Sequence, residues 1–292
     1  MSRRLDWKLD GRDWPNRESS RFVAAGGLDW HVQVMGEGPP IWLIHGTGAA
    51  THSWRDVTPL LAERFSVVAM DLPGHGFTRG RPPGGLTLAG MARALVALSQ
   101  ALGSIPQAIG AHSAGAAIAA RMALDGSHEA PIVAFGPALL PFGGSSAPIL
   151  SGLARLLFVN PLVPSLFARV ARIEGQTGRF LERSTGSRLD PRGVALYGRL
   201  FASPGHCAGA IEMMADWDLA AIARDLPMLP VKMHIVHGER DAAIKVADAR
   251  RAAGLAKAEF TLLPGLGHLA HEERPAMAVD LVAKAAAGGR EG

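Results

Sequence analysis

Hydrophobic positions along the chain fall into blocks with two kinds of spacing. Continuously apolar runs of five or six residues, typical of strands buried on both faces of a sheet, occupy residues 41–45, 65–70, 107–112, 131–135, 232–237 and 259–263. Helical periodicity predicts helices over residues 54–64, 86–102, 114–124, 246–255 and from 275 onward. Because strands and helices alternate, the chain is predicted to form an α/β fold with a mostly parallel, doubly wound sheet.

Two further strand-like runs, residues 22–25 and 30–35, come before the first buried strand. The turn between them carries Gly26 and Gly27, and a two-glycine loop between such runs is typical of a β-hairpin. We therefore expect an N-terminal antiparallel hairpin beside the parallel strands.

The alternation stops between residues 137 and 215. This stretch has a helical pattern and contains prolines, and residues 151–200 hold eight arginines against three acidic side chains. We interpret it as a helical cap, basic outside and apolar inside, inserted into an α/β core formed by residues 1–136 and 216–292. An ordinary solvated helix face explains the arginines equally well.

Composition narrows the classes of protein that need to be considered. The chain has 292 residues, 48% of them hydrophobic, and a net charge of +4 that is too small and dispersed to indicate nucleic-acid binding. The single cysteine, Cys207, excludes an internal disulfide and is consistent with a cytoplasmic location. The sequence shows neither an apolar run of 18 residues nor a signal peptide, so we expect membrane association, if the protein has it, to be peripheral and through the basic cap.

The first candidate for chemistry is Ser113, which lies between a predicted strand and a predicted helix. The strand-to-helix nucleophile elbow of serine hydrolases has the pattern G-x-S-x-G. This chain has Ala111 in place of the first glycine and keeps Gly115 as the second. Ser113 is therefore either a nucleophile at an elbow that carries one extra methyl group or a helix N-cap.

Two more polar residues follow predicted strands, and together with Ser113 they give the chain order Ser113, Asp241, His268. Ligands of parallel sheets bind at the carboxyl ends of strands, and this is the order of the α/β-hydrolase triad. A serine hydroxyl needs an imidazole to accept its proton and a carboxylate to orient that imidazole. Each residue alone has an ordinary structural explanation, but the three in this order favour a catalytic triad.

The oxyanion of such a reaction needs backbone donors, and the predicted ones are the N–H groups of Thr47 in "HGTGA" and of Ala114. His271 is the alternative base, and Asp216 or Asp218 is the alternative acid. The sequence contains no metal-ligand spacing and no glycine-rich phosphate loop with a lysine, so we expect no metal and no cofactor.

The segments "HGTGAATHSWRDVTPLLAERFSVVAMDLPGHGFT", "AHSAGAAIA", "HGERD" and "GLGHLAHEERP" resemble the α/β-hydrolase superfamily. With the leader "DGRDWPN", nearly the whole chain resembles the magnesium chelatase accessory proteins of bacteriochlorophyll biosynthesis. That resemblance implies a link to magnesium insertion into protoporphyrin IX and to magnesium chelatase as a partner, and it leaves the substrate open.

Two functions follow from the sequence. The first is a serine hydrolase that cleaves an ester or acyl bond of a hydrophobic small molecule under the cap. The second is a non-catalytic protein that binds a tetrapyrrole or assists the chelatase, because arginines suit the propionates of a porphyrin and also anionic lipid headgroups. Dehalogenases and epoxide hydrolases of this architecture carry aspartate where this chain has Ser113, which disfavours both.

Overall fold

The structure is a computed structural model that describes residues 4–141 and 162–288. Within these residues a nine-stranded sheet has the order β1-β2-β4-β3-β6-β7-β8-β9, with β5 paired to β2. The strands are β1 (Ser20–Ala25), β2 (Leu28–Met35), β3 (Pro40–Ile44), β4 (Ser66–Met70), β5 (Arg79–Gly80), β6 (Ala108–His112), β7 (Ile132–Phe135), β8 (Met233–Gly238) and β9 (Glu259–Leu263).

The sheet is parallel from β4 through β3, β6, β7, β8 to β9, and antiparallel where β2 pairs with β1, β4 and β5. The β1–β2 hairpin turns at Gly26 and Gly27, where φ is positive at both residues, as a two-residue hairpin loop requires. The predicted α/β fold, with a mostly parallel sheet and an N-terminal antiparallel hairpin, is confirmed.

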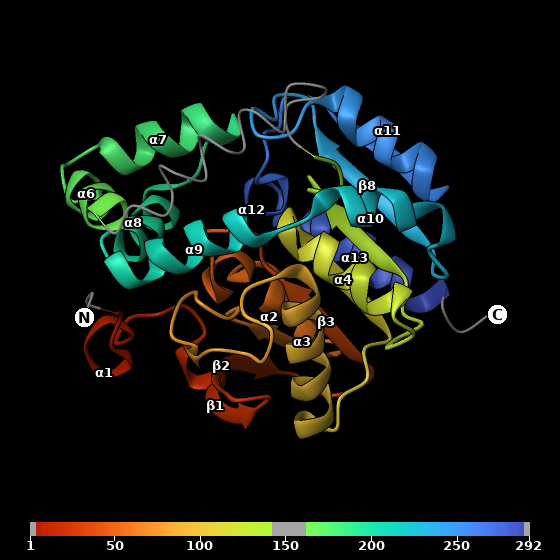
Figure 1. The fold of residues 1–292 in the computed structure, drawn as a ribbon, viewed down its shortest axis with the longest axis horizontal. Helices are drawn as coiled ribbons and strands as arrows, with labels where there is room; N and C mark the ends of the chain where they lie inside the picture. The colour runs from red at the N-terminus through yellow and green to blue at the C-terminus, as the bar shows by residue number, and fades with distance from the viewer. Residues whose placement is uncertain (1–3, 142–161, 289–292) are drawn as a thin grey trace.

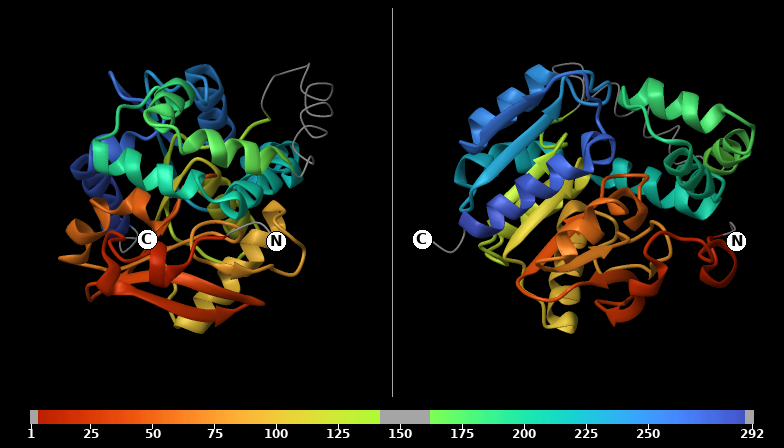
Figure 2. Two further views of the ribbon diagram at one scale, coloured as in Figure 1. Left: turned by 90° about the vertical axis from the view of Figure 1, so that its left-hand side faces the viewer. Right: turned by 180° about the vertical axis from the view of Figure 1, so that it is seen from behind.

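Helices cover both faces of the sheet (Figures 1 and 2). One core cluster joins the sheet to α3 (Leu88–Leu102), α4 (Ala114–Leu124), α10 (Leu219–Asp225) and α11 (Val246–Ala256). A second cluster joins the opposite face to α2 (Val57–Ala62) and α13 (Pro275–Gly288). The remaining short elements outside the cap are α1 (Trp7–Asp10), α12 (Ala270–Glu273) and the 3-10 turns η1 (Arg17–Ser19), η2 (Thr51–Trp54) and η4 (Leu226–Met228).

The helix predicted over residues 54–64 is shorter than expected. Residues Thr51–Trp54 form the 3-10 turn η2, and α2 begins only at Val57. Pro59 lies in the first turn of α2, which is the part of a helix that tolerates a residue without an N–H group. The apolar periodicity continued past this boundary, so it did not locate the start of the helix.

Between β7 and β8 the chain forms α6 (Leu162–Ala171), α7 (Gln176–Thr185), α8 (Pro191–Phe201) and α9 (Pro204–Asp216), which we call the cap helices. They lie together over the end of the sheet where the parallel strands finish (Figure 1). A third cluster, which includes Leu181, Leu200 and Trp14, joins them to the N-terminal segment.

The first part of the predicted cap, residues 142–161 with Arg155, lies outside the described residues. The division into a core and a cap at residues 137 and 215 stays a prediction. Over the part of the chain that the structure describes, the helices are too short or too polar to cross a membrane.

Candidate active site

Ser113 lies at a sharp turn between β6 and α4 and has φ +50° and ψ −115°. Such a backbone is rare for a residue other than glycine and costs about 1–3 kcal/mol, so it persists only where the surroundings enforce it. Here the N–H of Ser113 donates to Phe135 O at 2.9 Å, and its carbonyl accepts from Ala138 N at 3.1 Å. The side chain makes no capping hydrogen bond to α4, so Ser113 does not act as an N-cap through its hydroxyl.

Small residues on both sides of Ser113 allow this turn. A Cβ on Gly115 would collide with the carbonyl oxygens of Ile44 and His45, so the chain needs a glycine there. Ala111 is fully buried in the core cluster beside β3, and its methyl group fits. The departure from G-x-S-x-G is therefore accommodated at the position that has room for it.

The predicted acid and base meet directly. His268 Nδ1 lies 2.7 Å from Asp241 Oδ2, and the Asp241 side chain is fully buried. The other oxygen, Oδ1, accepts from the N–H groups of Ala243 and Ile244, both at 2.8 Å. Asp241 thus stabilises its own turn and orients the imidazole at the same time. With Nδ1 donating to the carboxylate, Nε2 of His268 keeps its lone pair.

The end of β7 brings the serine and the histidine to the same place. Phe135 O holds the N–H of Ser113, and a Cβ on the next residue, Gly136, would lie only 2.8 Å from His268 Nδ1 and 3.2 Å from Asp241 Oδ2. His112 contacts His268 as well, with ring centroids 4.7 Å apart and His112 Nε2 donating to His268 O at 3.2 Å. Burial lowers the pKa of His112 well below its ordinary value, so this neighbour is neutral.

The two candidate oxyanion donors lie in segments that border Ser113. Ala114 is the first residue of α4, so its N–H has no partner within the helix. The loop that carries Thr47 passes beside the serine, because a Cβ on Gly46 would lie 2.8 Å from Ser113 Cβ. The loop is held by His45, which accepts from Leu72 N at 2.9 Å and donates to Gly46 O at 2.7 Å.

The alternative base and acids occupy different environments. His271 is fully buried, and its Nε2 lies 2.8 Å from Ser53 Oγ, which itself donates to Glu272 Oε1 at 2.7 Å. Nε2 of His271 is therefore the donor, and burial lowers the pKa of His271 well below its ordinary value. Asp218 caps α10 by accepting from Ala220 N and Ala221 N. Asp216 lies at the end of α9, and the carboxylate that contacts the His268 ring at Nδ1 is that of Asp241.

Residues that the sequence analysis did not single out hold the histidine from the cap side. The N–H of His268 donates to Thr185 O at 2.8 Å, at the end of α7, and that of Leu269 donates to Ser187 Oγ at 2.9 Å. Ser187 Oγ donates to Glu273 Oε2 at 2.9 Å, which also accepts from Gly267 N at 2.8 Å. Thr185, Ser187 and Glu273 therefore fix the loop on which His268 sits.

A second buried polar cluster lies next to this loop and joins Arg55 to Glu272. Arg55 Nη1 lies 2.7 Å from Glu272 Oε2, and Arg55 Nη2 lies 2.9 Å from Asp190 Oδ2, the N-cap of α8. Tyr197 OH donates to Glu272 Oε1 at 2.7 Å. Burial raises the pKa of Glu272, and Arg55 and the hydroxyls of Tyr197 and Ser53 oppose that shift. In the sequence, the adjacent glutamates of "HEERP" are visible, but no pattern there links them to Arg55 or Tyr197.

Within the described residues, the one cysteine has a protonated thiol and no cluster of metal-ligating side chains is found. Cys207 is buried, which raises the pKa of its thiol to about 12 and keeps it protonated. Across residues 4–141 and 162–288, histidine, cysteine and carboxylate side chains nowhere form a group of three that could hold a metal ion.

The chain matches a known protein family over most of its length. Residues 43–281 match the model of the alpha/beta hydrolase family. The chain belongs to this family. It is 36% identical over 265 residues to the magnesium-chelatase 30 kDa subunit of Rhodobacter capsulatus, covering 89% of this chain and 92% of that protein, which confirms the predicted resemblance.

Two further relatives are similar over most of their length. A pimeloyl-[acyl-carrier protein] methyl ester esterase of Methylococcus capsulatus is 27% identical over 263 residues, 84% of this chain and 94% of that one. Among solved structures, an alpha/beta hydrolase fold protein from Burkholderia ambifaria superposes with a TM-score of 0.74 at 22% identity, covering 97% of this chain and 100% of that chain. The latter likeness concerns the fold alone.

Proposed function

We propose that the protein is a serine hydrolase that cleaves an ester or acyl bond of a hydrophobic small molecule. In this proposal Ser113 is the nucleophile, His268 the general base and Asp241 the residue that orients and stabilises the imidazolium. The N–H groups of Thr47 and Ala114 bind the oxyanion. The observation that carries the proposal is the 2.7 Å Asp241–His268 contact beside a serine at positive φ whose hydroxyl caps no helix.

The chemistry follows from the protonation states. His268 Nε2 takes the proton of Ser113 Oγ as that oxygen attacks the acyl carbon, and the buried Asp241 carboxylate stabilises the charged ring. The carbonyl oxygen becomes an oxyanion, and removing one of its two backbone donors typically costs about 3 kcal/mol of transition-state stabilisation. His268 then protonates the leaving group as its bond to the acyl carbon breaks. In the second half, His268 takes a proton from a water molecule that attacks the acyl carbon, and returns it to Ser113 Oγ as the bond between that oxygen and the acyl carbon breaks.

Membership of a family of hydrolases supports this proposal, as does the similarity to a methyl ester esterase over 84% of the chain. The cap helices supply apolar surface near the site, since Phe201 of α8 lies against the oxyanion loop: a Cβ on Gly48 would be 3.6 Å from Phe201 Cε1. A hydrophobic substrate under the cap fits that surface.

A fluorophosphonate probe tests the proposal, because it phosphonylates an activated serine. The wild-type protein should be labelled at Ser113, as mass spectrometry of the digested protein would show, and Ser113→Ala should abolish labelling. Ser127→Ala is the matched control, since Ser127 is exposed in the turn after α4 and should leave labelling unchanged. A folded wild-type protein that stays unlabelled would refute the hydrolase.

The second candidate is a non-catalytic protein that binds a tetrapyrrole or assists magnesium chelatase. The observation that favours it is the 36% identity, over 89% of this chain, to a protein named as a magnesium-chelatase subunit. Cap arginines would pair with propionate groups. Absorbance titration of the Ser113→Ala protein with protoporphyrin IX, and with its magnesium form, should give a saturable spectral shift; an unshifted spectrum at micromolar pigment contradicts this candidate.

The same candidate includes a peripheral contact with an anionic membrane. Leu162, Leu166 and Val170 recur every four residues along α6 and are exposed, and Arg169 and Arg172 lie beside them. Sedimentation with vesicles that contain anionic lipid should carry the protein down, whereas neutral vesicles should not. Equal recovery in the supernatant with both vesicle types would exclude the membrane contact.

A further inference from the structure

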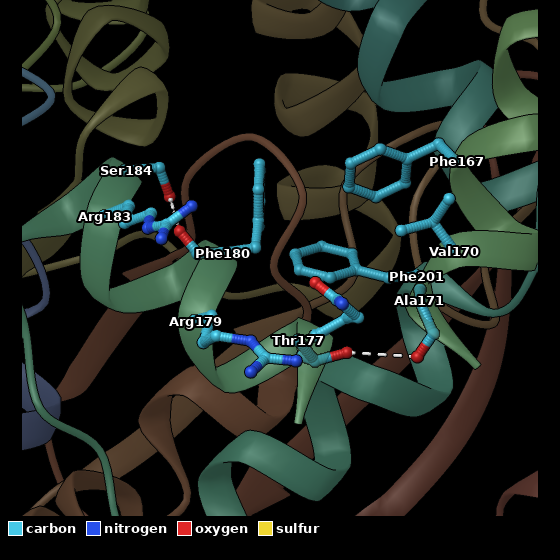
Figure 3. Close-up of a pocket in the computed structure, with 10 residues that line it drawn as sticks. Phe167, Val170, Ala171, Thr177, Arg179, Phe180, Arg183, Ser184 and Phe201 are labelled. Atoms are coloured by element: carbon cyan, nitrogen blue, oxygen red, sulfur yellow. Dashed lines mark hydrogen bonds between the residues drawn. The ribbon is translucent and has the colours of Figure 1, made fainter. Parts of the chain in front are cut away.

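A pocket lies among the cap helices (Figure 3), and Ser113 is not among the residues that line it. Its volume is about 340 Å³, and it lies between α6, α7 and the end of α8. We call it the cap pocket. It is lined by Phe167, Val170, Ala171, Gln176, Thr177, Arg179, Phe180, Arg183, Ser184 and Phe201.

Three phenylalanines form the apolar wall. The ring centroids of Phe167, Phe180 and Phe201 are 5.2–5.7 Å apart, and each pair packs edge to face. Phe180 keeps 43% of its surface exposed although it belongs to this cluster. Aromatic rings so arranged leave faces and edges free to contact an apolar ligand, and covering the exposed ring would gain hydrophobic free energy.

Among the described residues that line the cap pocket, the polar ones include two arginines and no carboxylate. Arg179 and Arg183 are exposed on α7, one turn apart, and within the part of the chain that the structure describes neither guanidinium has a recorded ion pair or hydrogen bond. Among the other cap arginines in the described residues, Arg199 pairs with Asp13, Arg188 with Glu182, and Arg172 donates to Ala202 O, whereas the guanidinium groups of Arg169 and Arg192 have no recorded ion pair or hydrogen bond and do not line the pocket. A pair of unpartnered guanidinium groups beside an apolar wall is complementary to a ligand that has an apolar body and an anionic end.

The size of the cap pocket restricts the body of that ligand. At about 340 Å³ it lies near the lower end of the ~300–1,000 Å³ typical of small-molecule sites. A single chain fits such a volume, whereas a macrocycle of four pyrroles would extend well outside it.

We propose that the cap pocket binds an apolar monocarboxylate of medium chain length, with its chain against the three phenylalanines and its carboxylate on Arg179 and Arg183. This site goes beyond the proposed hydrolysis, because binding here needs no reaction at Ser113. Phe201 belongs both to the pocket and to the contact with Gly48, so an occupant would touch the ring that backs the oxyanion loop.

Calorimetric titration of the Ser113→Ala protein with octanoate and with 1-octanol tests the proposal. Octanoate should bind saturably and more tightly than 1-octanol. The double variant Arg179→Gln/Arg183→Gln should weaken octanoate binding at least about tenfold, because it removes charge-assisted hydrogen bonds, and should leave 1-octanol binding within about twofold. Phe180→Ala should weaken both ligands.

The matched control is Arg192→Gln/Arg251→Gln, which removes the same charge from exposed positions outside the cap pocket and should change neither affinity. Octanoate that binds the Arg179/Arg183 variant as tightly as the parent, or that shows no saturable binding, overturns the proposal. Saturable binding of protoporphyrin IX without binding of octanoate overturns the ligand class. Because Ser113 is absent throughout, failure of probe labelling in the wild-type protein would refute the hydrolase and leave this site standing.

Discussion

The cap helices have two edges with opposite character. The inner edge, Thr185–Asp190 with Tyr197, is joined to the core by hydrogen bonds to the His268 loop, by the Arg55–Asp190 ion pair and by the hydrogen bond from Tyr197 OH to Glu272. The outer edge, on α6 and α7, leaves Leu166 62% exposed and Phe180 43% exposed, next to two arginines without recorded partners in the described chain. The cap therefore makes polar contacts with the core on one side and exposes apolar side chains on the other.

This difference separates two tasks. A buried polar network is costly unless every member is satisfied, and once satisfied it fixes one geometry. Exposed apolar surface adds little to the stability of the folded chain but gives a ligand something to cover. The inner edge is therefore expected to control stability and the geometry of His268, and the outer edge to control binding.

The largest expected effect is at the buried ion pair. Arg55→Ala should lower the free energy of unfolding by about 3–5 kcal/mol, because it leaves Glu272 charged and buried without its partner. Urea unfolding followed by circular dichroism measures this. Adding Glu272→Gln to Arg55→Ala should recover part of the loss, because it removes the unpaired buried charge.

The matched control on the surface is Arg188→Ala. Arg188 pairs with Glu182 at 3.3 Å, with both side chains more than half exposed, so its loss should cost less than about 1 kcal/mol. If Arg55→Ala and Arg188→Ala cost the same, the buried Arg55–Glu272 pair does not carry the stability assigned to it.

The second effect depends on pH and concerns His206 of α9. Gly76 N donates to its Nδ1 and its Nε2 donates to Gly48 O, so only the neutral ring fits. Burial lowers the pKa of His206 from 6.5 to about 4. The unfolded chain therefore takes up a proton below pH 6.5 that the folded chain does not, and stability is lost as pH falls from 6.5 towards 4.

Through His206, the free energy of unfolding should fall by about 2 kcal/mol between pH 7 and pH 5. His206→Gln should remove it and flatten the pH dependence of the urea midpoint, whereas His234→Gln, in the partly exposed β8 position, should flatten it less. A slope unchanged by His206→Gln would show that this ring is not the titrating contact between cap and core.

The third effect is at Ser187. Ser187→Ala leaves the buried N–H of Leu269 without an acceptor and should cost about 1 kcal/mol. It should also slow fluorophosphonate labelling, because the His268 loop loses a support. Ser184→Ala is the control, since Ser184 Oγ donates within α7 to Phe180 O. Equal labelling rates in the two variants would show that Ser187 does not position the His268 loop.

The smallest effect is expected on the outer edge. Leu166→Gln should change the free energy of unfolding by no more than about 0.5 kcal/mol, since the side chain is already exposed. Leu196→Ala, in the buried face of α8, should cost about 2–5 kcal/mol. A large loss in Leu166→Gln would show that the outer edge is covered in solution.

The sequence predicts features that depend on neighbouring residues, and it does not predict contacts between residues far apart in the chain. The buried strands and the order Ser113, Asp241, His268 were readable because each residue follows an apolar run, and parallel strands finish at one edge of a sheet. The contacts of Ser187 with Leu269 and of Arg55 with Glu272 join residues 82 and 217 positions apart and leave no periodic trace. The boundaries of α6 to α9 were not predicted, although Asp190-Pro191 and Ser203-Pro204 are N-cap and N1 pairs that mark the starts of α8 and α9.

The Thr185–His268 hydrogen bond has a consequence for how this family of folds can be varied. A cap is often treated as an exchangeable module that alters substrate choice while the catalytic centre stays intact. Here Thr185 O and Ser187 Oγ accept hydrogen bonds from the loop that carries His268, so we expect a chimera to need residues 185–190 transplanted together with 266–273. Exchange of the cap is therefore constrained by the contacts of its inner edge, whereas the residues of its outer edge can be changed freely.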